Sequence, residues 1–475
     1  IGGGLAGLSA ALEATRFADV EIIVMEKEKK LGGNSAKASS GINGVNSPAQ
    51  QSQQIGDSVE QFRQDTLESG HGLAEQPLVK VLCEQSSEAI RFVESFGIQL
   101  GQLSQCGGHS FPRTHRTIPP QGKATNVGFE IMRSFISQLP SHSSLQTLTH
   151  AKLTNLEFEK NKQWVATFLN TTTSHTHQIR ADAVILASGG YGADRHGLLT
   201  EFVPELKHLP TTNGPWALGE GVSIARSIGA KLTLMDQVQV HPTGFIDPKE
   251  PFAASKFLAP EALRGSGGIL VDAQGRRFVN ELGLRDHVSQ SIFSKGSLYS
   301  QFMNESQNLD EMASTMRFAY LIMNKAAVDK FYAPALGFYK FKGFIKEYES
   351  IEAFVETHPS IQFDVFHSTI EKYNKAATAT IQDEFGKSVF PVTFERNEPL
   401  HVMMITPVVH YTMGGIAITP KTQVLSAKNE IIEKLYAAGE VTGGTHGANR
   451  LAGNSLLECV VFGRIAAQQA IRDLL

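Results

Sequence analysis

The chain opens on Gly2-Gly3-Gly4-Leu5-Ala6-Gly7, within IGGGLAGLSAALEATRFADVEIIVMEKEK at residues 1–29. The six residues match GxGxxG, whose glycines allow a sharp turn and the close approach of a pyrophosphate to the backbone. Residues 5–16 have the apolar spacing of a helix, and residues 20–25 form an apolar run typical of a buried strand that ends at Glu26. The helix would present free N–H groups and its positive dipole end to the phosphates. The stretch therefore predicts a βαβ unit that binds a dinucleotide, with Glu26 accepting hydrogen bonds from the adenosine ribose.

Other glycine-rich segments favour a flavin as the second half of that dinucleotide. Leu31-Gly32-Gly33-Asn34-Ser35 follows the ribose acid, and Tyr436-Ala437-Ala438-Gly439-Glu440-Val441 lies near the C-terminus. Residues 447–457 follow and open another helix, whose N-terminus could reach a flavin ring. The residues that we predict to bind FAD are Gly2, Gly4, Ala6, Gly7, Glu26, Lys27, Gly33, Asn34, Ser35, Gly41, Gly190, Glu440, Asn454, Ser455 and Leu456.

The rest of the chain indicates two domains. At 475 residues the chain is too long for one small domain. Residues 145–187 alternate apolar and polar positions, and we expect an antiparallel ribbon with a turn at 161–162 that leads into a buried strand at 183–187. We predict the α/β class: a Rossmann-like FAD-binding domain of residues 1–236 and 410–475, interrupted by an α+β capping domain of residues 237–409.

Composition excludes several classes of function. The net charge of −4 offers no broad basic surface for nucleic acid. The cysteines, Cys83, Cys106 and Cys459, form no CxxC pair, which removes the ligands of iron–sulfur, structural zinc and covalent haem sites, and we expect three reduced, buried thiols. No run approaches the roughly 18 to 20 apolar residues of a membrane span. Because residue 1 is Ile, at the end of an expected strand, we expect that residues precede it in the full protein.

Five further segments carry a family resemblance that covers nearly the whole chain. They are His241-Pro242-Thr243-Gly244, Pro260-Glu261-Ala262-Leu263-Arg264-Gly265, residues 275–286 (GRRFVNELGLRD), His410-Tyr411-Thr412-Met413-Gly414-Gly415 and Gly447-Ala448-Asn449-Arg450-Leu451. With the glycine motif, they resemble the flavoproteins of fumarate reductase and succinate dehydrogenase, and most closely the soluble fumarate reductases.

The resemblance implies an activity and roles for individual residues. It implies that fumarate is reduced to succinate by a hydride from N5 of reduced FAD and a proton from Arg285. Glu261 and Arg264 match the relay that supplies this proton. His241, His410 and Arg450 match residues that hold the substrate carboxylates. A buried dianion needs such cations and directed donors, because unpaired buried charge is costly.

Two departures from the family pattern affect these expectations. Membrane-bound relatives have a histidine that binds FAD covalently after the Gly-Gly near the ribose acid, whereas this chain has Gly33-Asn34-Ser35-Ala36-Lys37. The resemblance therefore implies non-covalent FAD. Pro260 stands where bacterial soluble members have a threonine that contacts substrate, and Leu258 is a second position where selectivity could differ.

The sequence leaves the electron donor, the compartment and the exact substrate open. The chain has no second GxGxxG after a strand, so electrons would come from a free reduced flavin, a partner protein or a domain outside this sequence. We expect a soluble protein of the mitochondrion, endoplasmic reticulum or cytosol. The alternatives to fumarate reduction are an L-aspartate oxidase, a reductase of another enoate such as urocanate or a methacrylate-like acid, and a flavin-binding protein without turnover.

Overall fold

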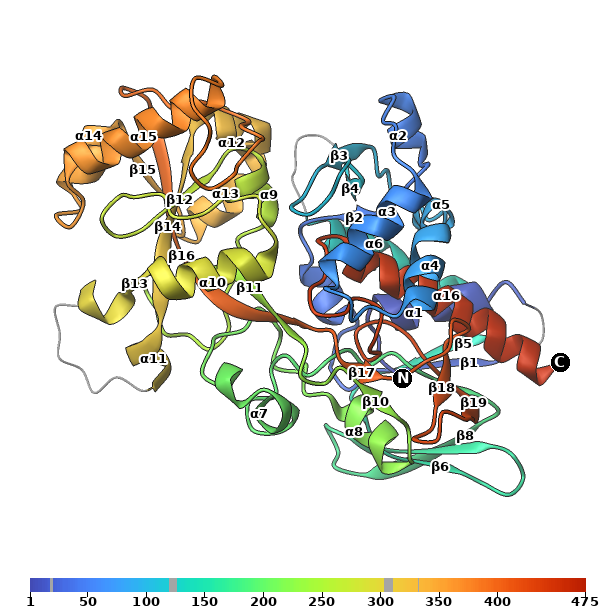
Figure 1. The fold of residues 1–475 in the computed structure, drawn as a ribbon. Coiled ribbons are helices and arrows are strands. Elements are labelled where there is room, and N and C mark those ends of the chain that lie inside the picture. Colours follow the sequence, from blue (N-terminus) through green and yellow to red (C-terminus); the bar gives the residue numbers. More distant parts are fainter. Residues whose placement is uncertain (18–19, 119–125, 303–310, 332) are drawn as a thin grey trace.

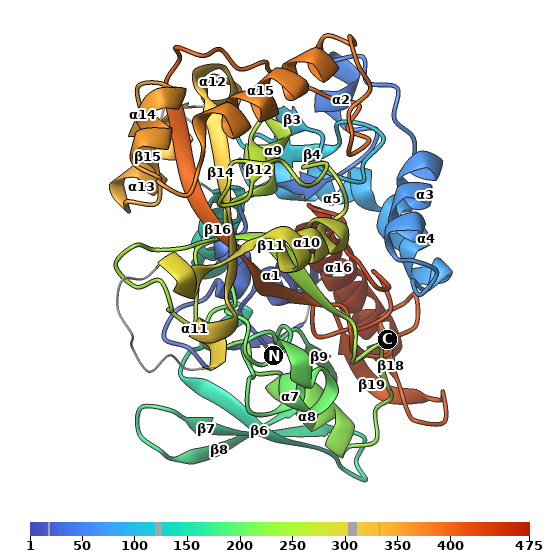
Figure 2. The same cartoon turned by 60° about the vertical axis from the view of Figure 1, so that its left-hand side comes forward.

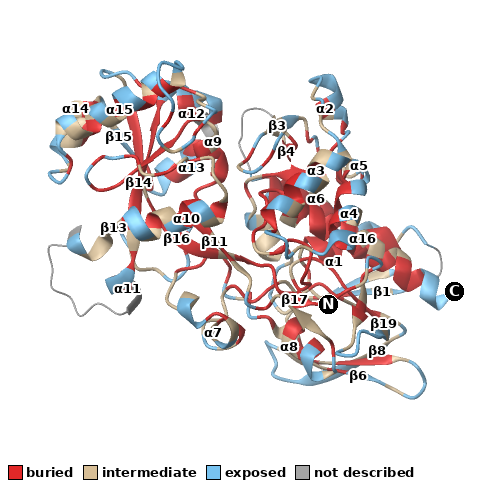
Figure 3. Ribbon diagram, viewed as in Figure 1, coloured by how far each residue is buried: buried red, intermediate tan, exposed pale blue. Residues whose placement is uncertain are grey.

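The chain folds into two lobes, each with its own hydrophobic core. A computed structural model describes residues 1–17, 20–118, 126–302, 311–331 and 333–475 (Figure 1). The first core is built from residues 5–235 and 409–470, and the second from residues 245–405. Figure 3 shows buried residues concentrated inside each lobe rather than in one continuous interior. We propose that the domain boundaries lie near residues 236 and 410, where the chain passes between the two cores.

The glycine turn lies where two short parallel strand pairs meet. β1 (Ile22–Met25) pairs with β5 (Leu145–Leu148), and β9 (Val184–Leu186) pairs with β19 (Ile431–Ala437). The Ile1 amino group donates to the Ile185 carbonyl at 2.8 Å, and the Gly2 N–H donates to the Met25 carbonyl at 2.7 Å. The start of the chain is therefore held between β9 and β1. The helix that follows, α1 (Leu5–Ala14), packs on the long C-terminal helix α16 (Asn454–Leu474).

Two local expectations were wrong. We expected residues 145–187 to form one ribbon, but residues 145–148 leave it and extend the parallel pairing beside β1, with the Ile22 N–H bonded to Ser144. The ribbon itself has three antiparallel strands, β6 (Ala151–Phe158), β7 (Trp164–Asn170) and β8 (Thr176–Ala181). We predicted a helix over residues 5–16, but the helix ends two residues earlier, at Ala14.

Smaller elements complete the first lobe. Further helices are α2 (Pro48–Ser52), α3 (Val59–Ser69), α4 (Gln76–Glu84), α5 (Ser86–Glu94), α6 (Val127–Gln138), α7 (Leu198–Phe202) and α8 (Glu220–Ser227). Further strands are β2 (Ile42–Asn43), β3 (Gln102–Ser104), β4 (Thr114–Arg116), β10 (Leu232–Thr233), β17 (Gly415–Ile416) and β18 (Gln423–Leu425). Short 3₁₀ turns cover Gly33–Lys37, Leu139–Ser141 and Pro204–Leu206. Within the described residues, no helix is both long and apolar enough to cross a bilayer.

The second lobe is an antiparallel sheet with helices around it. Its strands follow the order β11 (Val238–Phe245), β16 (Leu400–Thr412), β14 (Arg317–Asn324) and β12 (Ile269–Val271), with β13 (Ser297–Leu298) on β14 and β15 (Lys346–Tyr348) on β16. Its helices are α9 (Glu261–Gly265), α10 (Arg285–Lys295), α11 (Glu311–Thr315), α12 (Lys325–Phe331), α13 (Ala333–Phe341), α14 (Ile351–Glu356) and α15 (Phe363–Ala377), with a 3₁₀ turn at Tyr299–Phe302.

Two strands connect the lobes. β11 and β16 pair antiparallel and run from the second lobe into the first, as Figures 1 and 2 show from two sides. Their first-lobe ends carry the residues around His241 and His410. Any side chain on these ends is therefore placed at the boundary between the two cores.

A buried charge cluster stabilises the second lobe. The Glu281 carboxylate accepts hydrogen bonds from Arg277 at 2.8 Å and from Lys387 at 2.9 Å, and Arg277 also pairs with Asp383 at 2.7 Å. Burial alone would raise the pKa of Glu281, but the two cations lower it to about 2. The cluster ties the loop before α10 to the segment after α15, and its carboxylate is ionised throughout the neutral range.

Glu281→Gln should therefore destabilise the second lobe. Removing one partner of a buried pair costs roughly 3 kcal/mol, because the cations lose their counter-charge. We expect faster amide hydrogen exchange in β12 and β14, with little change in the first lobe. Glu356→Gln, at an exposed position in the same lobe, is the matched control. Equal protection in the two variants would contradict the assignment.

Candidate functional site

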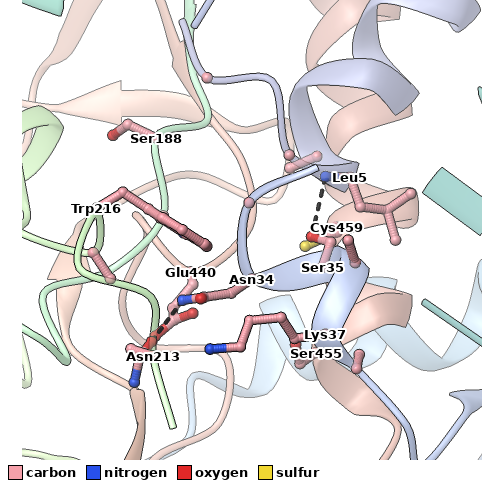
Figure 4. A pocket seen from close by; sticks show the side chains of 18 of the residues that line it. Leu5, Asn34, Ser35, Lys37, Ser188, Asn213, Trp216, Glu440, Ser455 and Cys459 are labelled. Carbon is pink, nitrogen blue, oxygen red and sulfur yellow. Dashed lines mark hydrogen bonds between the residues drawn. The ribbon is translucent and has the colours of Figure 1, made fainter. Parts of the chain in front are cut away.

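One cavity of about 780 Å³ extends from the glycine turn to the boundary between the lobes. Figure 4 shows its central part, where the side chains of Asn34, Lys37, Asn213, Trp216, Ser455 and Cys459 surround a common space. The second lobe contributes Ser255, Lys256, Phe257, Leu258 and Arg285 among other residues. The volume lies within the range of cofactor and ligand sites in proteins.

The glycine turn is built so that only one of its faces stays open. A Cβ at Gly2 would lie 2.3 Å from the Ala187 carbonyl oxygen, and one at Gly7 would lie 1.9 Å from that of Gly2. A Cβ at Gly4 would meet nothing closer than the Ser35 hydroxyl at 3.7 Å, on the side that lines the cavity. Gly4 also precedes the first turn of α1, whose N–H groups bear the positive end of the helix dipole. The turn therefore fits an anionic pyrophosphate, as the sequence predicts.

Glu26 lies on the cavity wall at the end of β1. Its Oε2 accepts from the Gly3 N–H at 2.8 Å, and its Oε1 accepts from the Glu28 N–H at 2.8 Å. These bonds fix the carboxylate beside the glycine turn. Lys27 also lines the cavity and pairs with Glu220.

The segment Gly33–Lys37 is held against residues 212–214. Asn34 donates to the Asn213 side chain at 2.6 Å and accepts from the Gly214 N–H at 2.9 Å, while Ser35 accepts from the Leu5 N–H at 3.1 Å (Figure 4). Lys37 donates to the Thr212 carbonyl at 2.5 Å, and burial lowers its pKa. Asn213, Thr212 and Trp216 also line the cavity and were not predicted.

Most of the predicted FAD-binding residues line this cavity. These are Gly2, Gly4, Ala6, Glu26, Lys27, Gly33, Asn34, Ser35, Gly41, Glu440, Ser455 and Leu456. Gly7, Gly190 and Asn454 do not. A Cβ at Gly190 would lie 2.0 Å from Thr412 Oγ1, so this glycine allows close packing of two loops, and buried Asn454 accepts from Asn43 at 2.6 Å.

Glu440 is a buried carboxylate at the cavity wall. Its Oε1 accepts from the Thr412 N–H at 3.0 Å and the Thr412 hydroxyl at 3.2 Å. Burial raises its pKa to about 7, although Thr412 and Arg450 act in the opposite direction. Glu440 therefore changes charge close to neutral pH.

The predicted relay residues are in contact. Arg285 begins α10 and donates through Nε to Glu261 Oε2 at 2.8 Å, and Arg264 Nη2 lies 3.8 Å from the same oxygen. Glu261 also accepts from the Gly107 N–H at 2.6 Å. Burial opposes ionisation of Glu261, but Arg285 and Arg264 lower its pKa to about 2. A single ionised carboxylate thus joins two buried arginines.

The predicted carboxylate-binding residues also converge, and donor atoms among them lack partners. The His241 and His410 rings lie 5.0 Å apart. His241 Nδ1 accepts from the Thr243 N–H at 3.1 Å, so the ring proton is on Nε2, which has no partner among the described residues. Arg450 Nε is likewise buried without a partner there. Such unpaired buried donors are costly unless a ligand accepts from them.

The charge of this cluster comes from arginine rather than histidine. Burial first, and Arg285 second, hold the pKa values of His241 and His410 well below the usual histidine range. His410 Nδ1 lies 2.7 Å from the Thr212 hydroxyl. Burial and Arg285 lower the pKa of Arg450 to about 10, so it remains protonated at neutral pH. The end of the cavity therefore offers the neutral His410 imidazole and the guanidinium groups of Arg285 and Arg450, with the His241 ring next to His410, and this set suits a small anion.

Gln239 joins the two halves of the site and was not predicted. Its Oε1 accepts from Arg285 Nη1 at 2.8 Å, and its Nε2 donates to Asn449 at 3.0 Å and to the Arg450 carbonyl at 2.8 Å. Gln239 is two residues before His241 on β11, so the two side chains share a face of the strand. That spacing is the signal in the sequence that could have identified it.

Among the described residues, neither the cysteines nor any cluster of possible metal ligands indicates a second chemical centre. Cys83, Cys106 and Cys459 are buried free thiols, as expected. In the part of the chain that the structure describes, no group of three or more His, Cys, Asp and Glu side chains could hold a metal ion.

Comparison with known proteins agrees with this geometry. The family model described as FAD binding domain matches residues 1–456. A fumarate reductase of Schizosaccharomyces pombe is 40% identical over all of this chain and 89% of the relative, and fumarate reductase 1 of Saccharomyces cerevisiae is 38% identical over all of this chain and 98% of the relative. The open conformation of a flavocytochrome c3 fumarate reductase superposes with a TM-score of 0.75 at 30% identity, covering all of this chain and 78% of that one.

Gly7→Ala should weaken FAD binding although Gly7 does not line the cavity. The new Cβ would overlap the Gly2 carbonyl, so the glycine turn must shift, and overpacking of this kind costs enough to reduce affinity by about tenfold or more. FAD affinity can be measured by quenching of flavin fluorescence. Gly56→Ala is the matched control, because a Cβ there meets nothing within 4 Å. Wild-type FAD affinity in Gly7→Ala would show that the glycine turn accommodates the new Cβ and would contradict the prediction.

Proposed function

This chain belongs to the FAD-binding family of flavoproteins that includes the fumarate reductases, and from that premise we propose that it reduces fumarate to succinate with the residues described above. It is an FAD-dependent oxidoreductase of the fumarate reductase kind. The observation that carries the proposal is the convergence of Arg285, Arg450 and His410 at one end of the cavity that begins at the FAD-binding glycine turn, with the His241 ring 5.0 Å from the His410 ring.

We propose that the dicarboxylate binds between the two lobes. Arg450 can hold one carboxylate with two parallel N–H bonds, a geometry in which guanidinium is stronger than ammonium. His241 and His410, both neutral, can donate to carboxylate oxygens without adding charge. These bonds would satisfy the unpaired His241 Nε2 and Arg450 Nε, which supports this assignment.

The chemistry requires a hydride and a proton. FAD, when bound and reduced, supplies the hydride to the alkene carbon. Arg450 and the histidines polarise the neighbouring carboxylate and make that carbon electrophilic. We propose that Arg285 gives a proton to the other alkene carbon and that Glu261 and Arg264 return one to it. Guanidinium normally keeps its proton, and Arg264 and Arg450 are two further cations close to Arg285.

We propose that FAD is bound without a covalent link and that electrons reach it from outside the described residues. The segment Gly33–Lys37 offers no histidine, and its side chains are engaged with Asn213, Gly214, Thr212 and Leu5. The donor would be a reduced flavin, a partner protein or a further domain. The substrate is a small dicarboxylate.

A reductase of another enoate is favoured by one observation. Leu258 lines the cavity, while Pro260 caps α9 beside Glu261, so the wall here differs from a threonine contact. Turnover rates on fumarate, urocanate and methacrylate separate fumarate reduction from the reduction of another enoate. Aspartate-dependent peroxide formation identifies an aspartate oxidase. Yellow, FAD-loaded protein with no turnover on any of the four would favour a binding protein.

Arg285→Lys should remove fumarate reduction and leave FAD bound. Lysine lacks the second arm that reaches Gln239 and cannot hold the same position toward Glu261, and a misplaced acid loses about 10²- to 10⁴-fold in rate. Activity with reduced viologen and the FAD absorption spectrum give the two readouts. Arg226→Lys, at an exposed position on α8, serves as the control. Normal turnover in Arg285→Lys would refute the proton-donor role.

Glu440 should make fumarate binding depend on pH near neutrality. As the pH rises through about 7, Glu440 becomes negative close to Arg450, while fumarate remains a dianion throughout. Titration of oxidised, FAD-loaded protein should therefore show affinity falling by about threefold or more from pH 6 to pH 8. In Glu440→Gln this part of the pH dependence should vanish. The same slope in both proteins would assign it to another group.

A further inference from the structure

The guanidinium of Arg450, whose Nε is unpaired, stacks on an aromatic ring. The Tyr411 ring lies under it, with the guanidinium carbon 4.3 Å from the ring centroid. The other contact of the guanidinium within the described residues is from Nη1 to the Leu451 carbonyl at 3.1 Å. Arg450 is almost fully buried and has lost most of its hydration. The cation–π contact with the Tyr411 ring compensates part of that loss.

The Tyr411 ring is itself anchored at its far end. Its hydroxyl donates to Glu458 Oε2, and the same carboxylate oxygen lies 2.9 Å from His446 Nε2. Tyr411 belongs to β16, His446 to the loop before Arg450, and Glu458 to α16. All three side chains are at most 4% exposed. The strand that connects the lobes is thereby joined to the helix that follows the FAD-binding loop.

The charges in this chain of contacts are consistent with such a role. Burial raises the pKa of Tyr411 well above its usual value, and Glu458 adds to that effect, so the hydroxyl keeps its proton and donates. Burial opposes ionisation of Glu458, but His446 and the Tyr411 hydroxyl lower its pKa. An ionised carboxylate thus holds the phenol by a charge-assisted hydrogen bond, and the negative charge polarises the ring toward the cation above it.

We propose that Tyr411, anchored by Glu458 and His446, is a positioning residue that fixes Arg450 for the substrate carboxylate. The proposal rests on the proposed function, because Arg450 is the carboxylate clamp there. The anchor prevents the ring from turning away and keeps the guanidinium at one height above it. A carboxylate that enters the site then finds the cation already placed and desolvated, with less ordering to be done on binding.

The test is fumarate binding to the oxidised, FAD-loaded protein, which cannot turn over without a donor. Tyr411→Phe keeps the ring and removes only the hydroxyl, so the anchor is lost. We expect the fumarate Kd by calorimetry to rise about 3- to 30-fold, in the range of a weakened cation–π contact. Tyr436→Phe is the matched control, because its hydroxyl donates to Asp473 at 2.6 Å elsewhere in the first lobe.

A double-mutant cycle separates the anchor from general packing. If the hydroxyl acts through Glu458, Tyr411→Phe and Glu458→Gln each weaken binding and the double variant is little worse than either. Acrylate has only one carboxylate. Its affinity should fall in these variants only if Arg450 is the residue that holds that carboxylate. In turnover with reduced viologen, kcat/KM should fall by at least the factor by which Kd rises, because Arg450 also polarises the carboxylate in the proposed reaction.

The outcomes are distinguishable. If Arg450→Lys leaves the fumarate Kd unchanged, the carboxylate clamp of the proposed function is wrong. If Arg450→Lys weakens binding while Tyr411→Phe stays within twofold of wild type, only the positioning role is overturned. Equal losses in Tyr411→Phe and Tyr436→Phe, or fully additive effects in the cycle, would also overturn it. Should Tyr411→Phe fail to retain FAD, the comparison of Glu458→Gln with Tyr436→Phe decides.

Discussion

Burying several arginines around one small pocket is costly, and the arrangement of both lobes follows from meeting that cost. Arg264, Arg285 and Arg450 are each at most 4% exposed, and Glu261 is the carboxylate that pairs with the first two. Arg450 has instead an aromatic face, a carbonyl and an unpaired Nε. The free protein therefore carries excess positive charge in low dielectric, which a dianion would neutralise. In this sense the fold places the positive charges before the anion binds.

Keeping these cations apart requires supports from different parts of the chain. Glu261 and Arg285 begin two separate short helices of the second lobe, while Arg450 is on a loop of the first. Gln239 on β11 bonds to Arg285 and to the backbone of Arg450. A strand that runs between the lobes therefore fixes the positions of these two arginines relative to each other. Because β11 pairs with β16, which carries His410 and Tyr411, one two-stranded connection sets the relative position of all these groups. A change in how the lobes meet would therefore move Arg285 and Arg450 relative to each other.

The sequence predicts which residues form the site better than it predicts which residues are in contact with one another. The GxGxxG turn, Glu26 and the motifs that hold the relay lead directly to residues that the structure brings together. Gly7, Gly190 and Asn454 are predicted to contact FAD but do not line the cavity, and they take part in close packing and a buried amide pair, which a motif does not distinguish from cofactor contact. The parallel pairing of residues 145–148 was missed because four residues carry too little periodicity to indicate a partner 123 positions away. The Tyr411–Glu458–His446 chain depends on tertiary contacts between distant segments, which no local pattern contains, whereas the two-residue spacing of Gln239 from His241 could have indicated Gln239.

The neutrality of the two histidines has a mechanistic consequence. If His241 and His410 were cationic near pH 7, the pocket would hold its dianion through groups whose charge varies with pH, and the nearby Arg285 would face further like charge. Burial and the arginines hold both rings neutral, so they act as oriented donors and the positive charge resides in groups that stay protonated. The variable charge is placed instead at Glu440, on the cavity wall, where ionisation opposes the anion rather than attracting it. The site thus separates a fixed cationic frame, which binds, from one titrating carboxylate, which adjusts the field that substrate and cofactor share.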